Sequence, residues 1–208
     1  MSQITPKFIY LDVGGVAIVD FSGNDKWNQM MSELGILGPK QEQFKKLWKE
    51  GESKLCVGNN NTEELAREIA KKIGFEIDPG YKMLDDFVAR FEKNTGLCTL
   101  LDQIKDRFRF GLLTNMYPGM LDQIIEAKLL PDVKWDMVVD STSVKRQKPN
   151  EDIYKYAQQL LNVMPEEILF VDNSERNLEV PKELGWQTVL YNSANTQVAN
   201  SNLLKLLL

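Results

Sequence analysis

Five short apolar segments recur along the chain, and helical segments separate the last four of them. The apolar segments are KFIYLDV (7–13), RFGLLTN (109–115), WDMVVDS (135–141), EILFVDN (167–173) and QTVLYN (187–192). Between the last four, hydrophobic residues recur at helical spacing. Continuously apolar strands that alternate with helices are typical of a parallel sheet covered on both faces. The sequence therefore predicts an α/β fold with a doubly wound, Rossmann-like parallel sheet.

The interval between the first two apolar segments has a different pattern. Residues 20–93 contain amphipathic helical stretches and almost no strand signal. Asn61, with Glu64 three residues later, has the form of a helix start, and Gly74 that of a helix end. We predict an α/β core at 1–19 and 94–208, with a small helical-bundle cap at 20–93 inserted after the first strand. The stretch NLLKLLL near the C-terminus is expected to be a helix packed on the core, because it is too short to cross a bilayer.

Composition narrows the chemistry that the chain can perform. Of its 208 residues, 43% are hydrophobic and 26% charged, and the formal net charge of −5 gives no basic surface for nucleic acid. Neither a membrane span nor an export signal is apparent, so a cytoplasmic location is expected. Cys56 and Cys98 are expected to be free thiols. The chain has no histidine, which excludes imidazole bases and leaves carboxylates, lysines, hydroxyls and a hard metal ion for catalysis.

Polar residues end three of the predicted strands, namely Asp12, Thr114 with Asn115, and Asp172. In open parallel sheets ligands bind at the carboxyl ends of the strands, so these side chains are expected to converge. Each one taken alone could be a simple turn residue. Lys148 precedes Pro149, which is expected at the start of a helix and would hold the lysine in an extended conformation facing the same edge.

The ordered set Asp12, Thr114, Lys148 and Asp172 resembles the four motifs of the haloacid dehalogenase-like hydrolase superfamily. The corresponding stretches are YLDVGGV, GLLTN, QKPNEDIY and ILFVDNSERNLEVPKELGW. They occur in the family's order and cover essentially the whole core, and the helical insert lies where one branch of the superfamily carries its cap. Any one of these short motifs alone would be weak.

The resemblance implies a Mg²⁺-dependent phosphatase that acts on a small phosphorylated metabolite. Asp12 would attack phosphorus and form an aspartyl-phosphate that water then hydrolyses. A carboxylate that approaches a phosphate dianion needs a cation between them, and Mg²⁺ prefers oxygen ligands. The implied metal ligands are Asp12, Asp172 and the backbone carbonyl of Gly14. The implied phosphate-binding groups are Thr114, Asn115 and Lys148. Thr114 and Lys148 would also have catalytic roles.

Two positions depart from the pattern of typical phosphatases in the family. Gly14 stands where they have an aspartate that protonates the leaving oxygen, a contribution of about 10²–10⁴-fold. Asn173 stands where related proteins often have a second acid, and we expect weaker Mg²⁺ binding as a result. The Asp-x-Gly-[Gly/Asn]-Val form of the first motif is most similar to a sugar-phosphatase-like subset. Asp20 is the nearest acid that could supply the proton, although a solvated turn acid is the commoner role.

Two other functions stay open on the sequence. A catalytically impaired relative could bind a phosphorylated ligand or a partner without turnover. A 2-haloacid dehalogenase would use the same nucleophile without metal, but it would not need the acid at Asp172. In the cap, Trp27, Trp48, Phe44, Met30 and Met31 are expected mainly to pack, and Lys45, Lys46 and Arg67 mainly to be solvated. The sequence does not specify the substrate or the oligomeric state.

Overall fold

The five apolar segments form one sheet in the computed structural model, which describes residues 5–208. The strands are β1 (Phe8–Leu11), β4 (Arg109–Thr114), β5 (Trp135–Asp140), β6 (Ile168–Asp172) and β7 (Gln187–Leu190). Their order across the sheet is β5-β4-β1-β6-β7, and every pairing is parallel. The chain therefore winds from β1 to one side and then to the other, which confirms the predicted doubly wound α/β fold.

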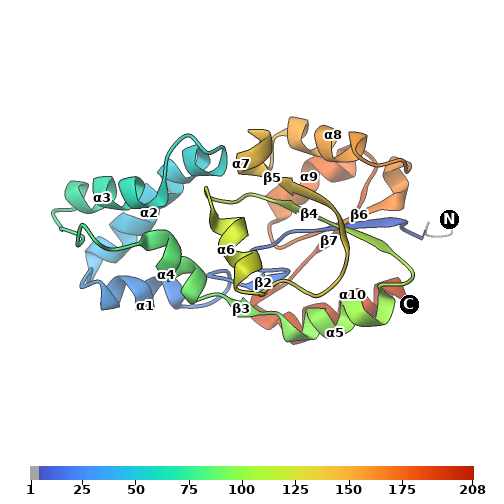
Figure 1. Cartoon of the computed structure of the whole chain (residues 1–208), viewed down its shortest axis with the longest axis horizontal. Coiled ribbons are helices and arrows are strands. Elements are labelled where there is room, and N and C mark those ends of the chain that lie inside the picture. The colour runs from blue at the N-terminus through green and yellow to red at the C-terminus, as the bar shows by residue number, and fades with distance from the viewer. Residues whose placement is uncertain (1–4) are drawn as a thin grey trace.

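Alternate residues of β1 pack against helices on opposite faces of the sheet. Ile9 and Leu11 belong to the apolar cluster that includes α5 and α10, whereas Phe8 and Tyr10 belong to the cluster that includes α8 and α9. Figure 1 shows these two helix pairs on opposite sides of the strands. The helices of the core are α5 (Thr95–Ile104), α6 (Met120–Glu126), α7 (Ser141–Val144), α8 (Glu151–Gln159), α9 (Glu175–Glu183) and α10 (Thr196–Leu207). Both faces of β1 are buried, which explains its continuous apolar sequence.

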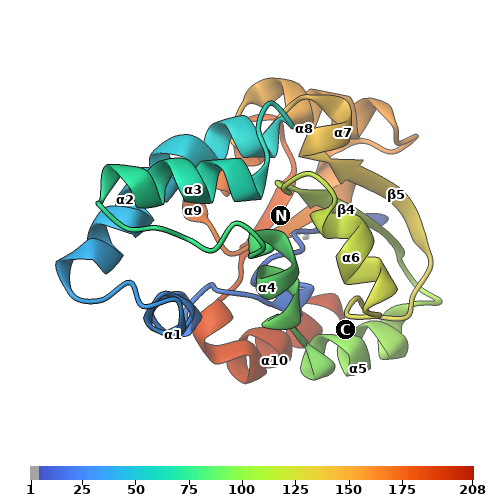
Figure 2. The same ribbon diagram turned by 60° about the vertical axis from the view of Figure 1, so that its left-hand side comes forward.

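Four helices form a group beside the core, as Figure 2 shows. They are α1 (Lys26–Glu33), α2 (Pro39–Cys56), α3 (Thr62–Lys72) and α4 (Met83–Ala89). Asn61 is the N-cap of α3, and its Oδ1 accepts a hydrogen bond of 2.8 Å from the Glu64 backbone N–H. Gly74 follows the helix with a φ of 66°. These four helices are hereafter called the cap, and the division into a core of 1–19 and 94–208 and a cap of 20–93 stays a prediction.

A short antiparallel pair joins the cap to the core at the two ends of the insert. β2 (Ile18–Val19) precedes α1 and pairs with β3 (Glu92–Lys93), which follows α4. The sequence did not predict this pair, because two-residue strands are too short to show an alternating pattern. The pair brings the two crossings of the chain between cap and core together.

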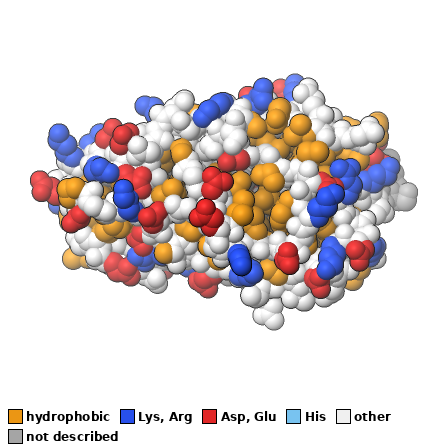
Figure 3. Space-filling model, viewed as in Figure 1, with side chains coloured by type: hydrophobic (Ala, Val, Ile, Leu, Met, Phe, Trp, Pro, Cys, Tyr) orange, Lys and Arg blue, Asp and Glu red, His pale blue; other side chains and the backbone are white. Residues whose placement is uncertain are grey.

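The surface of the core carries apolar side chains near β5. Figure 3 shows them gathered over this part of the molecule, with acidic and basic side chains interspersed elsewhere on the same face. Val138 of β5 is 48% exposed and Ile125 of α6 is 52% exposed. β5 is an edge strand, so its outer side has no neighbouring strand to cover it. Within residues 5–208, none of the helices has the length and apolar character needed to span a bilayer.

Candidate active site

Three adjacent strands bring Asp12, Thr114 and Asp172 together at their carboxyl ends. β1 lies between β4 and β6, Asp12 follows β1 directly, and the other two residues are the last of β4 and β6. The Thr114 hydroxyl donates a hydrogen bond of 2.9 Å to Asp12 Oδ1. Asp12 is 7% exposed, and Thr114 and Asp172 are fully buried. The order of the strands reverses at β1, and such a point is the usual ligand site of an open α/β sheet.

Lys148 joins the two aspartates. Its Nζ lies 2.9 Å from Asp12 Oδ1 and 2.6 Å from Asp172 Oδ2, and the residue is 3% exposed. The backbone of Lys148 is held by Asn115, whose Nδ2 donates to the Lys148 carbonyl and whose Oδ1 accepts from the Lys148 N–H, each at 2.9 Å. Asn115 therefore positions the lysine, and its direct binding of phosphate stays a prediction. The expected helix start at Pro149 was wrong, because α8 begins at Glu151 with Asn150 as N-cap.

Burial and charge act against each other in this cluster. Burial raises the pKa of Asp12, Lys148 opposes that shift, and the neighbouring Asp172 adds to it. Burial lowers the pKa of Lys148, but the two carboxylates outweigh burial, and its net shift is upward. Lys148 is thus held in its charged form, and a buried positive charge faces the two acids.

The two carboxyl oxygens of Asp12 differ in their surroundings. Oδ1 accepts hydrogen bonds from the Val13 backbone N–H at 2.7 Å and from Thr114, and it also pairs with Lys148. Within the part of the chain that the structure describes, no donor contacts Oδ2. The Asp12 side chain is 11% exposed. Oδ1 is therefore fixed by the protein, and Oδ2 is the oxygen with a lone pair available to a ligand.

Asp172 is oriented by residues that the sequence analysis missed. Asn177 Nδ2 lies 3.1 Å from Asp172 Oδ1 and 3.2 Å from Oδ2, and the Ser174 N–H donates to Oδ1 at 2.8 Å. Asn177 lies five residues after Asp172 in the first turns of α9, and that position on the helix is the only sequence signal for this contact.

Asn173, which replaces a possible second acid, has a structural partner. Its Nδ2 donates to Ser193 Oγ at 3.0 Å, and the Ser193 hydroxyl donates to the Gly15 carbonyl at 2.6 Å. Gly15 has a φ of 74° and would, with a side chain, collide with Asn173. Asn173 therefore ties the end of β6 to the loop after Asp12. The expected weakening of Mg²⁺ binding stays a prediction.

The donors at this site suit a hard divalent cation. Asp12 and Asp172 are both close enough to contact Lys148 Nζ, and together with this buried lysine they carry a net negative charge when ionised. No cluster of three or more His, Cys, Asp or Glu side chains within 5–208 could bind a metal, so the side-chain ligands offered here are the two carboxylates, to which the Gly14 carbonyl could add a third oxygen. Two carboxylates and a carbonyl, completed by water, fit Mg²⁺.

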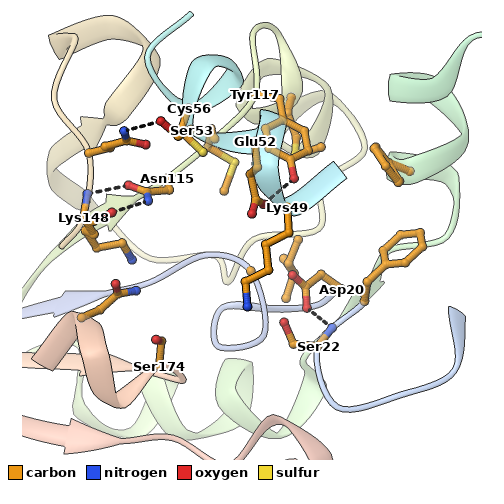
Figure 4. Close-up of a pocket in the computed structure, with 18 of the residues that line it drawn as sticks. Asp20, Ser22, Lys49, Glu52, Ser53, Cys56, Asn115, Tyr117, Lys148 and Ser174 are labelled. Carbon is orange, nitrogen blue, oxygen red and sulfur yellow. Dashed lines mark hydrogen bonds between the residues drawn. The ribbon is translucent and has the colours of Figure 1, made fainter. Parts of the chain in front are cut away.

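A cavity of about 720 Å³ lies between the cap and the core, and Lys148 of this cluster is among the residues that line it. Gly14, Asn115 and Lys148 line its core side, and Figure 4 shows Lys148 and Asn115 on one wall with Asp20 and Lys49 across from them. The cap side combines aromatic side chains such as Trp27 and Phe87 with charged ones such as Lys49 and Glu52. This size suits a small-molecule ligand, and the cavity places its polar groups close to the aspartates.

The cap residues have mixed roles. Phe44, Trp48, Met30 and Met31 are at most 2% exposed and pack as expected, whereas Trp27 lines the cavity. Lys45 pairs with Glu42 on the same helix, and neither Lys46 nor Arg67 lines the cavity. A lysine of the cap that does line it is Lys49 of α2, which sequence reasoning missed because nothing in the helical pattern distinguishes it from its neighbours.

Comparison with known proteins agrees with this architecture. A solved structure of a predicted haloacid dehalogenase-like hydrolase from Porphyromonas gingivalis shares 25% identity over 97% of this chain and 99% of its own, with a TM-score of 0.74. A HAD family enzyme from Bacteroides thetaiotaomicron, solved as a complex with magnesium and inorganic phosphate, shares 19% identity over 90% and 95%, with a TM-score of 0.70. The L-2-haloacid dehalogenase of Xanthobacter autotrophicus shares 18% over 90% and 78%, with a TM-score of 0.65.

The sheet, the four-helix cap and the buried aspartate–lysine cluster define a capped α/β protein with a cavity between the two parts. A model of the haloacid dehalogenase-like hydrolase family matches residues 40–185. The chain belongs to this family of hydrolases.

Proposed function

We propose that the protein is a Mg²⁺-dependent phosphatase that hydrolyses a small phosphorylated metabolite through an aspartyl-phosphate on Asp12. The main support is the arrangement of Asp12, with Oδ1 fixed by three contacts and Oδ2 without a donor. A nucleophilic carboxylate must be held in place while one oxygen stays free to attack. The similar fold of a HAD family enzyme that binds magnesium and inorganic phosphate adds support.

In the first half of the reaction, Asp12 Oδ2 attacks phosphorus and the bond from phosphorus to the leaving oxygen breaks. Lys148 faces Asp12 and offers its charge to the phosphoryl oxygens, and the Thr114 hydroxyl lies on the same side. In the second half, water attacks phosphorus and releases phosphate and the Asp12 carboxylate. The walls of the cavity limit access of bulk water.

Asp12, Asp172 and the Gly14 carbonyl would hold the Mg²⁺ ion. When bound, the ion supplies positive charge that offsets the repulsion between the nucleophile and the phosphate dianion. Asn177 keeps Asp172 in place for that role by contacting both of its oxygens.

The first experiment measures phosphate release from a panel of phosphorylated metabolites, with and without Mg²⁺. We expect Mg²⁺-dependent turnover of at least one compound, and a loss of about 10³-fold or more in Asp12→Asn, because removal of a nucleophile costs several orders of magnitude. Asp25→Asn, an exposed acid in the segment before α1, is the matched control and should keep the wild-type rate.

Equal rates for wild type and Asp12→Asn would overturn the proposal. Ligand-induced thermal stabilisation without product would instead support a binding protein that does not turn over its ligand. Halide release from a 2-haloacid without metal would indicate dehalogenation.

A further inference from the structure

Asp20 occupies the space into which a side chain at Gly14 would extend. A Cβ atom placed on Gly14 would lie 2.5 Å from Asp20 Oδ2 and 3.4 Å from Asp20 Cγ. Cβ atoms in proteins essentially never come within 3.0 Å of another heavy atom in this way. A side chain at position 14 would therefore require the carboxyl group of Asp20 to shift from the place that it occupies beside Gly14.

The backbone around Asp20 directs its carboxyl group toward this position. The chain turns back after Asp12 so that Gly14 and Ile18 form a β-bridge, and Asp20 follows directly on β2. The Ser22 backbone N–H donates a hydrogen bond of 2.8 Å to Asp20 Oδ1, which orients Oδ2 toward Gly14. Figure 4 shows Asp20 with this hydrogen bond at the wall of the cavity. The carboxyl group is thus held by the fold and is accessible to a ligand.

On the basis of the proposed phosphatase function, we propose that Asp20 is the residue that protonates the leaving-group oxygen, in place of the side chain absent at Gly14. As Asp12 Oδ2 bonds to phosphorus and the bond to the leaving oxygen breaks, the proton of the Asp20 carboxyl group passes to that oxygen and the leaving group departs as an alcohol. Asp20, now a carboxylate, then takes a proton from the water that attacks phosphorus. Phosphate leaves, Asp12 is restored, and Asp20 is protonated again.

The contribution of Asp20 is tested by varying the leaving group. The probes are 4-nitrophenyl phosphate, whose leaving oxygen needs little protonation, and phenyl phosphate, whose more basic oxygen needs more. We expect Asp20→Asn to lower kcat/KM on phenyl phosphate by about 10²–10⁴-fold and to lower it much less on 4-nitrophenyl phosphate, because kcat/KM reports only the steps up to departure of the leaving group. Asn keeps an acceptor for Ser22, so the loop is preserved. Asp25→Asn is the control and should match the wild type on both probes.

The close approach of Asp20 to Gly14 allows a test by exchange of the two residues. Gly14→Ala adds one methyl group, which would displace Asp20, so its selective loss on phenyl phosphate should resemble that of Asp20→Asn. Gly14→Asp combined with Asp20→Gly places the acid on the other side of the same space and removes the collision. We expect this double variant to regain at least about 10-fold in kcat over Asp20→Gly alone.

An equal loss of kcat/KM on both probes, or no loss on either, would overturn the role of Asp20 as the acid, and so would a double variant no faster than Asp20→Gly. These failures differ from failure of the proposed function. If the wild type releases phosphate and Asp12→Asn does not, the function stands whatever Asp20 does. If the wild type releases no phosphate from any compound, both proposals fail.

Discussion

Asp20 has a carboxyl group that is costly to ionise where it lies. Burial raises its pKa, and hydrogen bonds from Ser22 only partly offset that shift. An acid with a higher pKa in the folded than in the unfolded chain binds protons more tightly when folded. Its contribution to stability is therefore present at pH values below the unfolded pKa of about 4 and is lost as the pH rises through the folded pKa. Ionisable groups with a pKa shifted by burial, at the wall of a cavity, are common among functional residues.

We accordingly predict that Asp20→Asn stabilises the folded protein at neutral pH. Asparagine keeps the acceptor for Ser22 but carries no charge to bury, so the Tm of the variant should exceed that of the wild type at pH 7, and the difference should disappear near pH 4. Thermal unfolding followed across this pH range without Mg²⁺ measures it. Asp25→Asn, an exposed acid, should show no such trend, and a difference independent of pH would contradict the assignment to ionisation.

One side chain of α1 contacts both crossings of the chain between cap and core. Lys26 Nζ donates to the Arg90 carbonyl at 2.7 Å and to the Val19 carbonyl at 3.4 Å, and it pairs with Glu92 at 2.8 Å. Val19 is in β2 and Glu92 in β3, so a single lysine links both crossings of the chain. The side chain is 15% exposed, which strengthens these contacts compared with a fully solvated ion pair.

Lys26→Met should loosen this connection. Methionine keeps much of the apolar stem but removes the donor, and hydrogen bonds to a charged group contribute about 1.5–3 kcal/mol. We expect amide hydrogen exchange in residues 16–22 and 90–95 to become about 10-fold faster or more, because the free energy of local opening falls by that amount. Lys40→Met is the control, since Lys40 also donates to a carbonyl, that of Gly74, but entirely within the cap. Unchanged exchange at both crossings would show that the β2–β3 pairing alone holds them.

The elements that the sequence predicted well are those with strong periodic patterns. The five strands were predicted because each contains a short run of apolar residues, and the positions of Asp12, Thr114 and Asp172 at strand ends followed from the parallel sheet. The sequence did not predict contacts that depend on how loops return to the sheet. The meeting of Asp20 with Gly14 and the hydrogen bonds of Asn177 to Asp172 depend on local backbone directions, which have no periodic signal.

At the scale of the whole molecule, one apolar cluster extends from the core into the cap. It includes Leu11 of β1 and Leu203 of α10 as well as Phe44 and Trp48 of α2. Polar contacts accompany this packing, because Tyr117, in the loop after β4, accepts a hydrogen bond of 3.1 Å from Trp48 Nε1 and donates one of 2.6 Å to Glu52. A continuous core of this kind is expected to make cap and core unfold together.

Tyr117→Phe tests how firmly the cap is held to the core. The substitution keeps the ring but leaves the Glu52 carboxylate and the Trp48 N–H without their shared partner, and an unsatisfied buried group costs about 1–3 kcal/mol. For a chain of this length, each kcal/mol lowers Tm by about 2–4 °C. Calorimetry should therefore show a lower Tm for Tyr117→Phe, still in a single transition, because the apolar cluster is unchanged.

Tyr81→Phe is the matched control for this measurement. It also removes a hydroxyl that donates to a carboxylate, that of Asp86 at 2.5 Å, but both partners lie in the cap. Tyr81→Phe should lower Tm without changing amide exchange along the core-facing side of α2, whereas Tyr117→Phe should accelerate exchange there. Two separate transitions in Tyr117→Phe would mean that the hydroxyl, rather than the shared apolar cluster, couples the cap to the core. A single transition at lower Tm would assign the coupling to the packing of α2 against the core and leave Tyr117 as the contact that sets its strength.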